Sequence, residues 1–154
     1  SITYIGISAF EGCSSLESIT IPKNVKWISQ LFDGCDSLKN IIVDKDHPIY
    51  DSRNNCNAVI ETRTNELIVG CATTIIPNSV TSIGSSAFSG CIGLTSITIS
   101  DSVTNIGETA FFTGAQCLCI NKSMYEDTMP NATNFSIFLQ CFSCCLYIFY
   151  LSRA

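Results

Sequence analysis

A repeated segment of 22 or 23 residues constrains the fold of this chain more than any other feature of its sequence. Residues 77–99 read PNSVTSIGSSAFSGCIGLTSITI, and from Ser79 onward they match residues 1–21 nearly position for position. A fixed period of this length is typical of a solenoid, in which copies stack and bury each other's faces. One phenylalanine marks each of four copies, 22 residues apart in the first pair and 23 in the last: Phe10, Phe32, Phe88 and Phe111.

Each copy ends in a strand pattern. In the copy at 77–99, Ile97 and Ile99 alternate with polar residues after Leu94, and the same pattern recurs at 16–21 and 38–43. An alternation of period two predicts a half-buried strand. Stacked copies would then form a parallel sheet, and its outward side chains would make a binding strip: Ser18, Thr20, Asn40, Ile42, Ser96 and Thr98.

The remainder of each copy predicts how the chain returns to the next strand. Pro22 and Pro77 end their strands, because proline cannot donate to a ladder. The V-x-x-I-G pattern that follows predicts a turn on the opposite face, and A-F-x-G-C supplies a buried phenylalanine and a glycine bend. We therefore expect the four phenylalanines to form one column beneath successive parallel strands.

The full pattern, I-P-x-S-V-T-x-I-G-x-x-A-F-x-G-C-x-x-L-x-S-I-x-I, closely resembles the BspA-like leucine-rich repeat. The resemblance covers about residues 1–120 and is specific in three copies, while the copy at 100–120 starts well and then decays. It implies a mostly β repeat solenoid, with a parallel sheet on the concave face and short turns or helical turns on the convex side. It also implies a secreted or cell-surface protein, since some members of the family are adhesins for host proteins.

The predicted organisation is a solenoid over 1–120 and an atypical tail over 121–154. The copies are 1–21, 22–43, an enlarged unit at 44–76, 77–99 and 100–120. Because the chain starts in the middle of a copy, we expect it to be a fragment of a longer array, with any secretion signal upstream.

The enlarged unit predicts a β-hairpin. Residues 58–61 and 66–69 are short apolar runs on either side of Thr-Arg-Thr-Asn, and Asn65 can adopt a positive φ. The D-x-x-x-P-x-Y-x-S pattern of residues 44–52 resembles the hairpin-bearing units of the family. We expect this hairpin to project from the coil and to carry what is individual to this protein.

The only histidine lies in the same unit and suggests a metal hypothesis. Asp44, Asp46, His47 and Asp51 fall within eight residues, but their spacing matches neither a zinc site nor an EF-hand. A solvated acidic turn is favoured, and no metal is predicted. Trp27 is interpreted either as a partly exposed aromatic on the convex side or as a ligand contact.

Ten cysteines raise the question of disulfides. Cys13, Cys35 and Cys91 occupy one repeat position, which favours a column of buried free thiols that fill space as small hydrophobic side chains. Adjacent copies would lie about 4.8 Å apart, so distance does not exclude a bridge between Cys13 and Cys35.

The tail is polar over residues 121–134 and strongly apolar over 135–151. This uncharged segment of 17 residues is at the lower limit for a membrane span, and Gln140 weakens that interpretation. Three interpretations stay open: an unnatural or misread end, a cap packed on the last copy, or a membrane anchor.

Composition and motifs limit the function. The net charge of −5, without a run of lysine or arginine, makes nucleic acid and anionic membranes poor partners. A single histidine, with no G-x-S-x-G and no phosphate-loop pattern, predicts neither an enzyme nor a cofactor. A strip of hydroxyl and amide groups suits contact with protein or glycan. The sequence thus predicts a non-catalytic module for protein–protein interaction or adhesion, and the alternative is a structural spacer without a ligand of its own.

Overall fold

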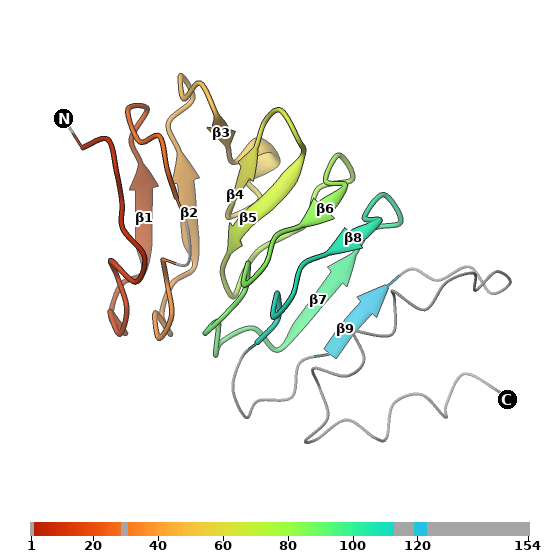
Figure 1. Ribbon diagram of the computed structural model, residues 1–154. Helices are drawn as coiled ribbons and strands as arrows, with labels where there is room; N and C mark the ends of the chain where they lie inside the picture. The colour runs from red at the N-terminus through yellow and green to blue at the C-terminus, as the bar shows by residue number, and fades with distance from the viewer. Residues whose placement is uncertain (1, 29–30, 113–118, 123–154) are drawn as a thin grey trace, which may run out of the picture.

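The computed structural model describes residues 2–28, 31–112 and 119–122, and the strand patterns of the repeats form strands in it. Strand β1 (Ser18–Ile21) pairs in parallel with β2 (Asn40–Val43), and β7 (Ser96–Ile99) pairs in parallel with β9 (Cys119–Lys122). The register joins equivalent positions of neighbouring copies, since Ile19 lies opposite Ile41 and Ile21 opposite Val43. Figure 1 shows these strands side by side along the array.

The expected parallel sheet is interrupted in the middle. Residues 71–76, which hold the strand position of the enlarged unit, belong to neither two-stranded sheet. The Ile75 N–H donates instead to the Cys56 carbonyl at 3.1 Å. The copies before and after this unit therefore form two separate pairs of parallel strands.

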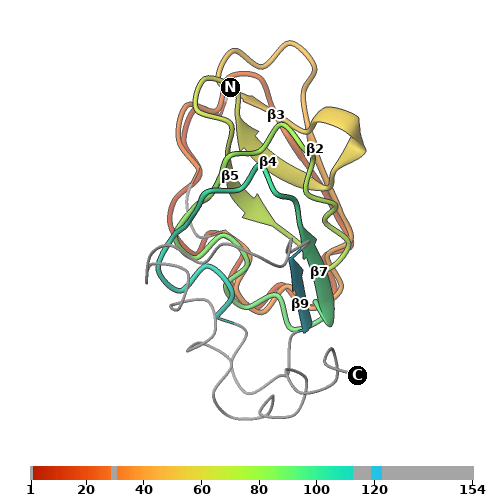
Figure 2. The same cartoon turned by 90° about the vertical axis from the view of Figure 1, so that its right-hand side faces the viewer.

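A second sheet lies on the opposite side of the coil. It is ordered β3 (Tyr50–Asp51), β4 (Ala58–Glu61), β5 (Glu66–Gly70), β6 (Ser82–Ile83) and β8 (Asn105–Ile106). Figure 2 places β4 and β5 across the molecule from β7 and β9. The prediction of turns here was incomplete, because the V-x-x-I-G segments make short parallel strands and Tyr4 forms a parallel bridge with Trp27.

The predicted hairpin is confirmed, but its predicted position is wrong. Strands β4 and β5 are antiparallel, and Asn65 between them has φ of +57°. Instead of projecting from the coil, the hairpin lies inside the stack, with Ala58, Val59 and Ile60 fully buried. Because neighbouring side chains of a strand point to opposite faces, burial of three in a row means that both faces of the hairpin are covered.

The hairpin separates two hydrophobic clusters. Val59 and Val69 pack with residues of the first two copies, including Ile21, Ile41 and Phe32. The alternate side chains pack with residues of the copies at 77–112. Ala58, Ile60 and Leu67 are in this second cluster.

The phenylalanines form two stacked pairs and not the single column that we expected. Phe10 and Phe32 lie 5.7 Å apart between ring centroids, and Phe88 and Phe111 lie 5.1 Å apart. Gly70 occupies the phenylalanine position of the enlarged unit. Its N–H donates to Ala87 O in the next copy, which is the same hydrogen bond that the Phe88 N–H makes with Ala110 O. A β-carbon on Gly70 would come within 2.1 Å of the Phe88 ring.

The cysteine column is confirmed at Cys35 and Cys91 and is wrong at Cys13, which is exposed. The Cys35 Sγ lies 3.0 Å from Phe10 O, and the Cys91 Sγ lies 3.5 Å from Gly70 O, so each thiol donates to the preceding copy. Cys13 has no described copy before it to cover it. Burial raises the pKa of the Cys91 thiol to about 12, so it stays protonated and inert near neutral pH. The five cysteines with described side chains are free thiols.

Two glycines at one repeat position allow the stacking contact to be measured. Gly12 and Gly90 have φ of +71° and +70°, but a β-carbon would meet nothing within 4 Å at Gly12 and would lie 2.7 Å from the Asp33 Cα at Gly90. Gly12→Ala should therefore cost only the backbone strain, about 1–2 kcal/mol. Gly90→Ala should cost about 1–3 kcal/mol more, because the backbone of the neighbouring copy must move.

Urea unfolding of the two variants measures this difference directly. Equal losses of stability would mean that the copies do not approach each other as closely at Gly90 as the structure has them.

Candidate functional site

The candidate site is the strand face, which we define as the outward side of β1, β2 and β7 together with the equivalent residues of 71–76. All six side chains of the predicted strip are exposed on it. Ser18 lies opposite Asn40 in the parallel register, and Thr20 lies opposite Ile42. Side chains on adjacent parallel strands are about 4.8 Å apart, so these four form a grid of hydroxyl, amide and apolar groups. Ser96 and Thr98 extend the face on β7.

Two residues of this face were missing from the predicted strip. Thr73 and Ile75 are exposed, and the residue that follows each of them, Thr74 and Ile76, is buried. Residues 73–76 thus continue the alternation of the other copies. The signal was available, because Cys71 aligns with Leu16 and therefore places Thr73 and Ile75 at the outward positions. Ile75 is 73% exposed and Ile42 is 49% exposed, so two neighbouring copies offer apolar side chains on a polar surface.

The enlarged unit interrupts the strand face with residues 52–57. The Ser52 Oγ accepts the N–H of Val43 at the end of β2, and the short 3-10 helix η1 (Arg53–Asn55) follows. In Figure 2 this helix, drawn in yellow, lies on the same side as β2 and β7. The face is thus divided into a first part on β1 and β2 and a second part on β7.

Arg53 holds this interruption in place. Its guanidinium binds both carboxylate oxygens of Asp51, at 2.7 and 2.6 Å, and also donates to Asn65 Oδ1 and Ser79 Oγ. Burial alone would raise the pKa of the Asp51 carboxyl, but the hydrogen bonds and charge of Arg53 outweigh it and the pKa lies below its usual value. A bidentate pair of this kind fixes geometry as well as charge.

The acidic residues around His47 do not converge on a common point. The Nε2 of His47 lies 2.8 Å from Val25 O, and its Nδ1 accepts the N–H groups of Ile49 and Tyr50. Asp51 pairs with Arg53, and an oxygen of Asp44 accepts the N–H of Asp46. Both ring nitrogens are therefore used within the fold, and among the described residues no group of three or more potential ligands could hold a metal ion. The histidine fastens the turn to the preceding copy.

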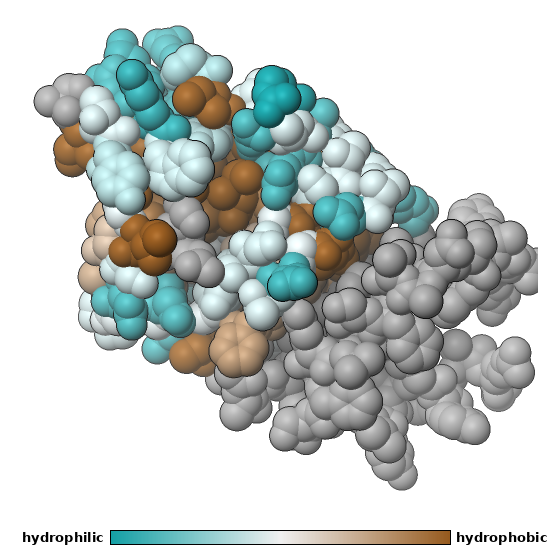
Figure 3. All heavy atoms as spheres, in the orientation of Figure 1, coloured by the Kyte–Doolittle hydropathy of each residue, from teal (hydrophilic) through white to brown (hydrophobic). Residues whose placement is uncertain are grey.

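Trp27 is 60% exposed and lies beside Tyr4, itself 61% exposed, on the side opposite the strand face. In the view of Figure 3, apolar side chains are scattered among polar ones. In the part of the chain that the structure describes, no helix is long and apolar enough to span a bilayer. The apolar segment 135–151 lies outside the described residues.

Comparison with known families identifies the repeat. The model of the "BspA type Leucine rich repeat region" matches residues 1–66 and 70–151 in six copies. This range extends beyond residue 120, where we expected the repeats to end. A search of curated proteins found no match.

Two solved structures are similar to this chain. One is a leucine-rich cell surface protein from Faecalibacterium prausnitzii A2-165, with 30% sequence identity over 78% of this chain and a TM-score of 0.58. The other is the pneumococcal vaccine antigen PcpA, with 23% identity over 69% of this chain and a TM-score of 0.55, which shows a shared fold. The chain spans 33% of the length of the first and 27% of the second.

The role of His47 can be tested by substitution. His47→Ala removes the donor to Val25 O and the acceptor of the Ile49 and Tyr50 N–H groups. Buried backbone groups left without partners should lower the free energy of unfolding by about 2–4 kcal/mol. The control, Asp46→Ala, removes an exposed side chain from the same turn and should change it by less than about 0.5 kcal/mol. Urea unfolding measures both, and a loss at Asp46 as large as that at His47 would contradict this assignment.

Proposed function

Because the chain belongs to the BspA type leucine-rich repeat family, we propose that it is a non-catalytic binding module whose strand face contacts a partner protein. The proposal extends to a surface or secreted location, for which the similar cell surface protein of Faecalibacterium prausnitzii is the support. A host or extracellular matrix protein fits this location, and a glycan is the other chemistry that the face suits.

The observation that supports the proposal is the composition of the exposed strand face. Its polar members are serine, threonine and asparagine, which donate and accept hydrogen bonds without a charge to desolvate. Its apolar members are Ile42 and Ile75, both exposed on neighbouring copies. Apolar anchors surrounded by polar groups are the usual arrangement of a protein–protein interface, in which a few buried side chains carry most of the affinity.

Stacking gives the face a fixed geometry. The Ser18–Asn40 and Thr20–Ile42 pairs are held by the ladder of β1 and β2, whose inward residues Ile21, Ile41 and Val43 are buried. A partner therefore meets side chains that are already positioned, and the entropy lost on binding is smaller than for a flexible loop.

Binding to an array of purified extracellular-matrix proteins and glycans tests the proposal. The chain with Asn40, Ile42, Ser96 and Thr98 replaced by alanine should bind the array component recognised by the unmodified chain at least about tenfold more weakly, since loss of an apolar anchor costs more than about 1.4 kcal/mol.

The matched control carries Tyr4→Ser, Trp27→Ser and Asn105→Ala, which change exposed residues on the opposite side. It should bind as the unmodified chain does. If only the control bound more weakly, the binding site would lie on the side of Trp27, and the proposal would be contradicted. An array on which nothing binds would favour a structural spacer.

A further inference from the structure

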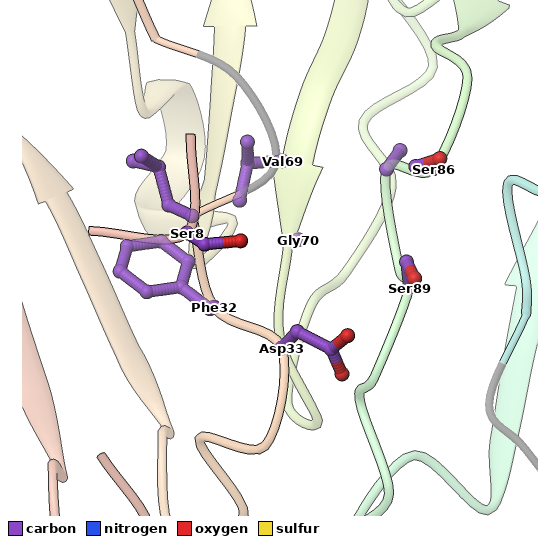
Figure 4. A pocket seen from close by; sticks show the side chains of 9 residues that line it. Ser8, Phe32, Asp33, Val69, Gly70, Ser86 and Ser89 are labelled. Carbon is purple, nitrogen blue, oxygen red and sulfur yellow. The ribbon is translucent and has the colours of Figure 1, made fainter. Parts of the chain in front are cut away.

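A cavity of about 120 Å³ opens on the side of the coil that joins β6 to β7. Its walls come from residues 31–33 and 86–89 of two copies, which bring Phe32 and Asp33 from one side and Ser86 and Ser89 from the other. Val69 and Gly70 of the enlarged unit lie between them, as Figure 4 shows. We call this cavity the notch.

The notch exists because the enlarged unit lacks the turn of the other copies. Elsewhere the turns of adjacent copies are joined by hydrogen bonds. The Gly12 N–H donates to Asp33 O at 2.8 Å, and the Gly90 N–H donates to Phe112 O at 2.9 Å. In the enlarged unit Gly70 is followed at once by Cys71, so the five residues that separate the phenylalanine and leucine positions of the other copies are missing, and no side chain extends outward from Gly70. The close approach of Gly90 to Asp33 closes one end of the gap.

The size of the notch limits what can enter it. Sites for cofactors and drug-sized ligands have volumes of about 300–1,000 Å³, which is well above that of the notch. A cavity near 150 Å³ accommodates a group the size of benzene. The notch therefore has room for one side chain and not for a small-molecule ligand.

The lining of the notch favours a side chain with an apolar stem and a polar end. Phe32 and Val69 are 4% exposed and supply apolar walls. Ser8 and Ser89 bring hydroxyl groups, and Ser86 Oγ is bonded to Thr109 Oγ1 at 2.9 Å. The Asp33 carboxylate lies 2.0 Å from where a β-carbon on Gly90 would stand, so it is beside Gly90 at one end of the notch, and it is exposed to solvent there.

The negative charge near the notch favours a side chain whose polar end is positively charged. Glu11 holds the repeat position of Asp33 in the adjacent copy, and both are exposed. Among the described residues, Arg53 pairs with Asp51 and Arg63 pairs with Glu61. Neither of these ion pairs involves the carboxylate of Asp33 or Glu11. Two carboxylates on adjacent copies create a negative potential that a cation relieves.

We propose that the notch receives one lysine or arginine side chain of the partner protein, with its alkyl stem against Phe32 and Val69 and its charged end at Asp33. This inference rests on the proposed function for the existence of a protein partner, but it concerns a different surface. Long cationic side chains combine these two kinds of contact readily, because the stem buries while the charge stays hydrated.

Butylguanidinium and butylammonium serve as probes for the two side chains. Each is titrated into the ¹⁵N-labelled full chain while amide shifts are followed by NMR. The amides of Gly70, Ser89 and Gly90 should shift and saturate, while those of Thr20 and Thr98 on the strand face should not. The probe with the larger effect identifies the preferred side chain. Pentanol, which has a similar apolar stem and no charge, should bind more weakly.

Asp33→Asn should weaken the binding of the better probe roughly threefold, the size expected for one exposed charge pair. Asp36→Asn, an exposed carboxylate outside the notch lining, is the matched control and should change nothing. The proposal is overturned if the notch amides do not shift, if pentanol binds as well as the cations, or if both substitutions weaken binding equally. The four alanine substitutions on the strand face should leave probe binding intact, so failure of the proposed function is distinguishable from failure of the notch.

Discussion

The structure depends on the burial of one hairpin on both of its faces. Val59 and Val69 of β4 and β5 pack against the first two copies, while Ala58, Ile60 and Leu67 pack against the later ones. A 22-residue copy is too small to bury a core of its own, so its stability comes from its neighbours. The hairpin is the shared neighbour that packs against the hydrophobic clusters of both halves.

The irregular features of the molecule follow from this insertion. Strand pairing on the strand face stops at 71–76, because this segment bonds to Cys56 of the enlarged unit. The phenylalanine stack breaks at Gly70, which has no side chain and admits the ring of Phe88. The notch opens where the turn of the unit is missing. The same event thus creates the divided strand face and the second candidate site.

The repeats could be predicted from the sequence, because their strands bury one face and so alternate with period two, as at Ile19 and Ile21. The position of the hairpin could not be predicted as readily. Its apolar run at 58–60 fits either an exposed excursion or a strand with both faces buried, and only the lack of alternation favoured the second. The outward positions of Thr73 and Ile75 could have been predicted by aligning Cys71 with Leu16. The notch could not, because it depends on packing between copies that are distant in sequence. The exposure of Cys13 reflects its position at the first described copy.

Amide hydrogen exchange on the full chain tests most directly whether the hairpin is the shared wall of the two clusters. We predict that amides of β4 and β5 are protected as strongly as those of β2, and far more strongly than those of Arg63 and Thr64 between them, because opening the hairpin would expose both clusters. Exchange of β4 and β5 at the rate of Arg63 and Thr64, with β2 still protected, would contradict this prediction.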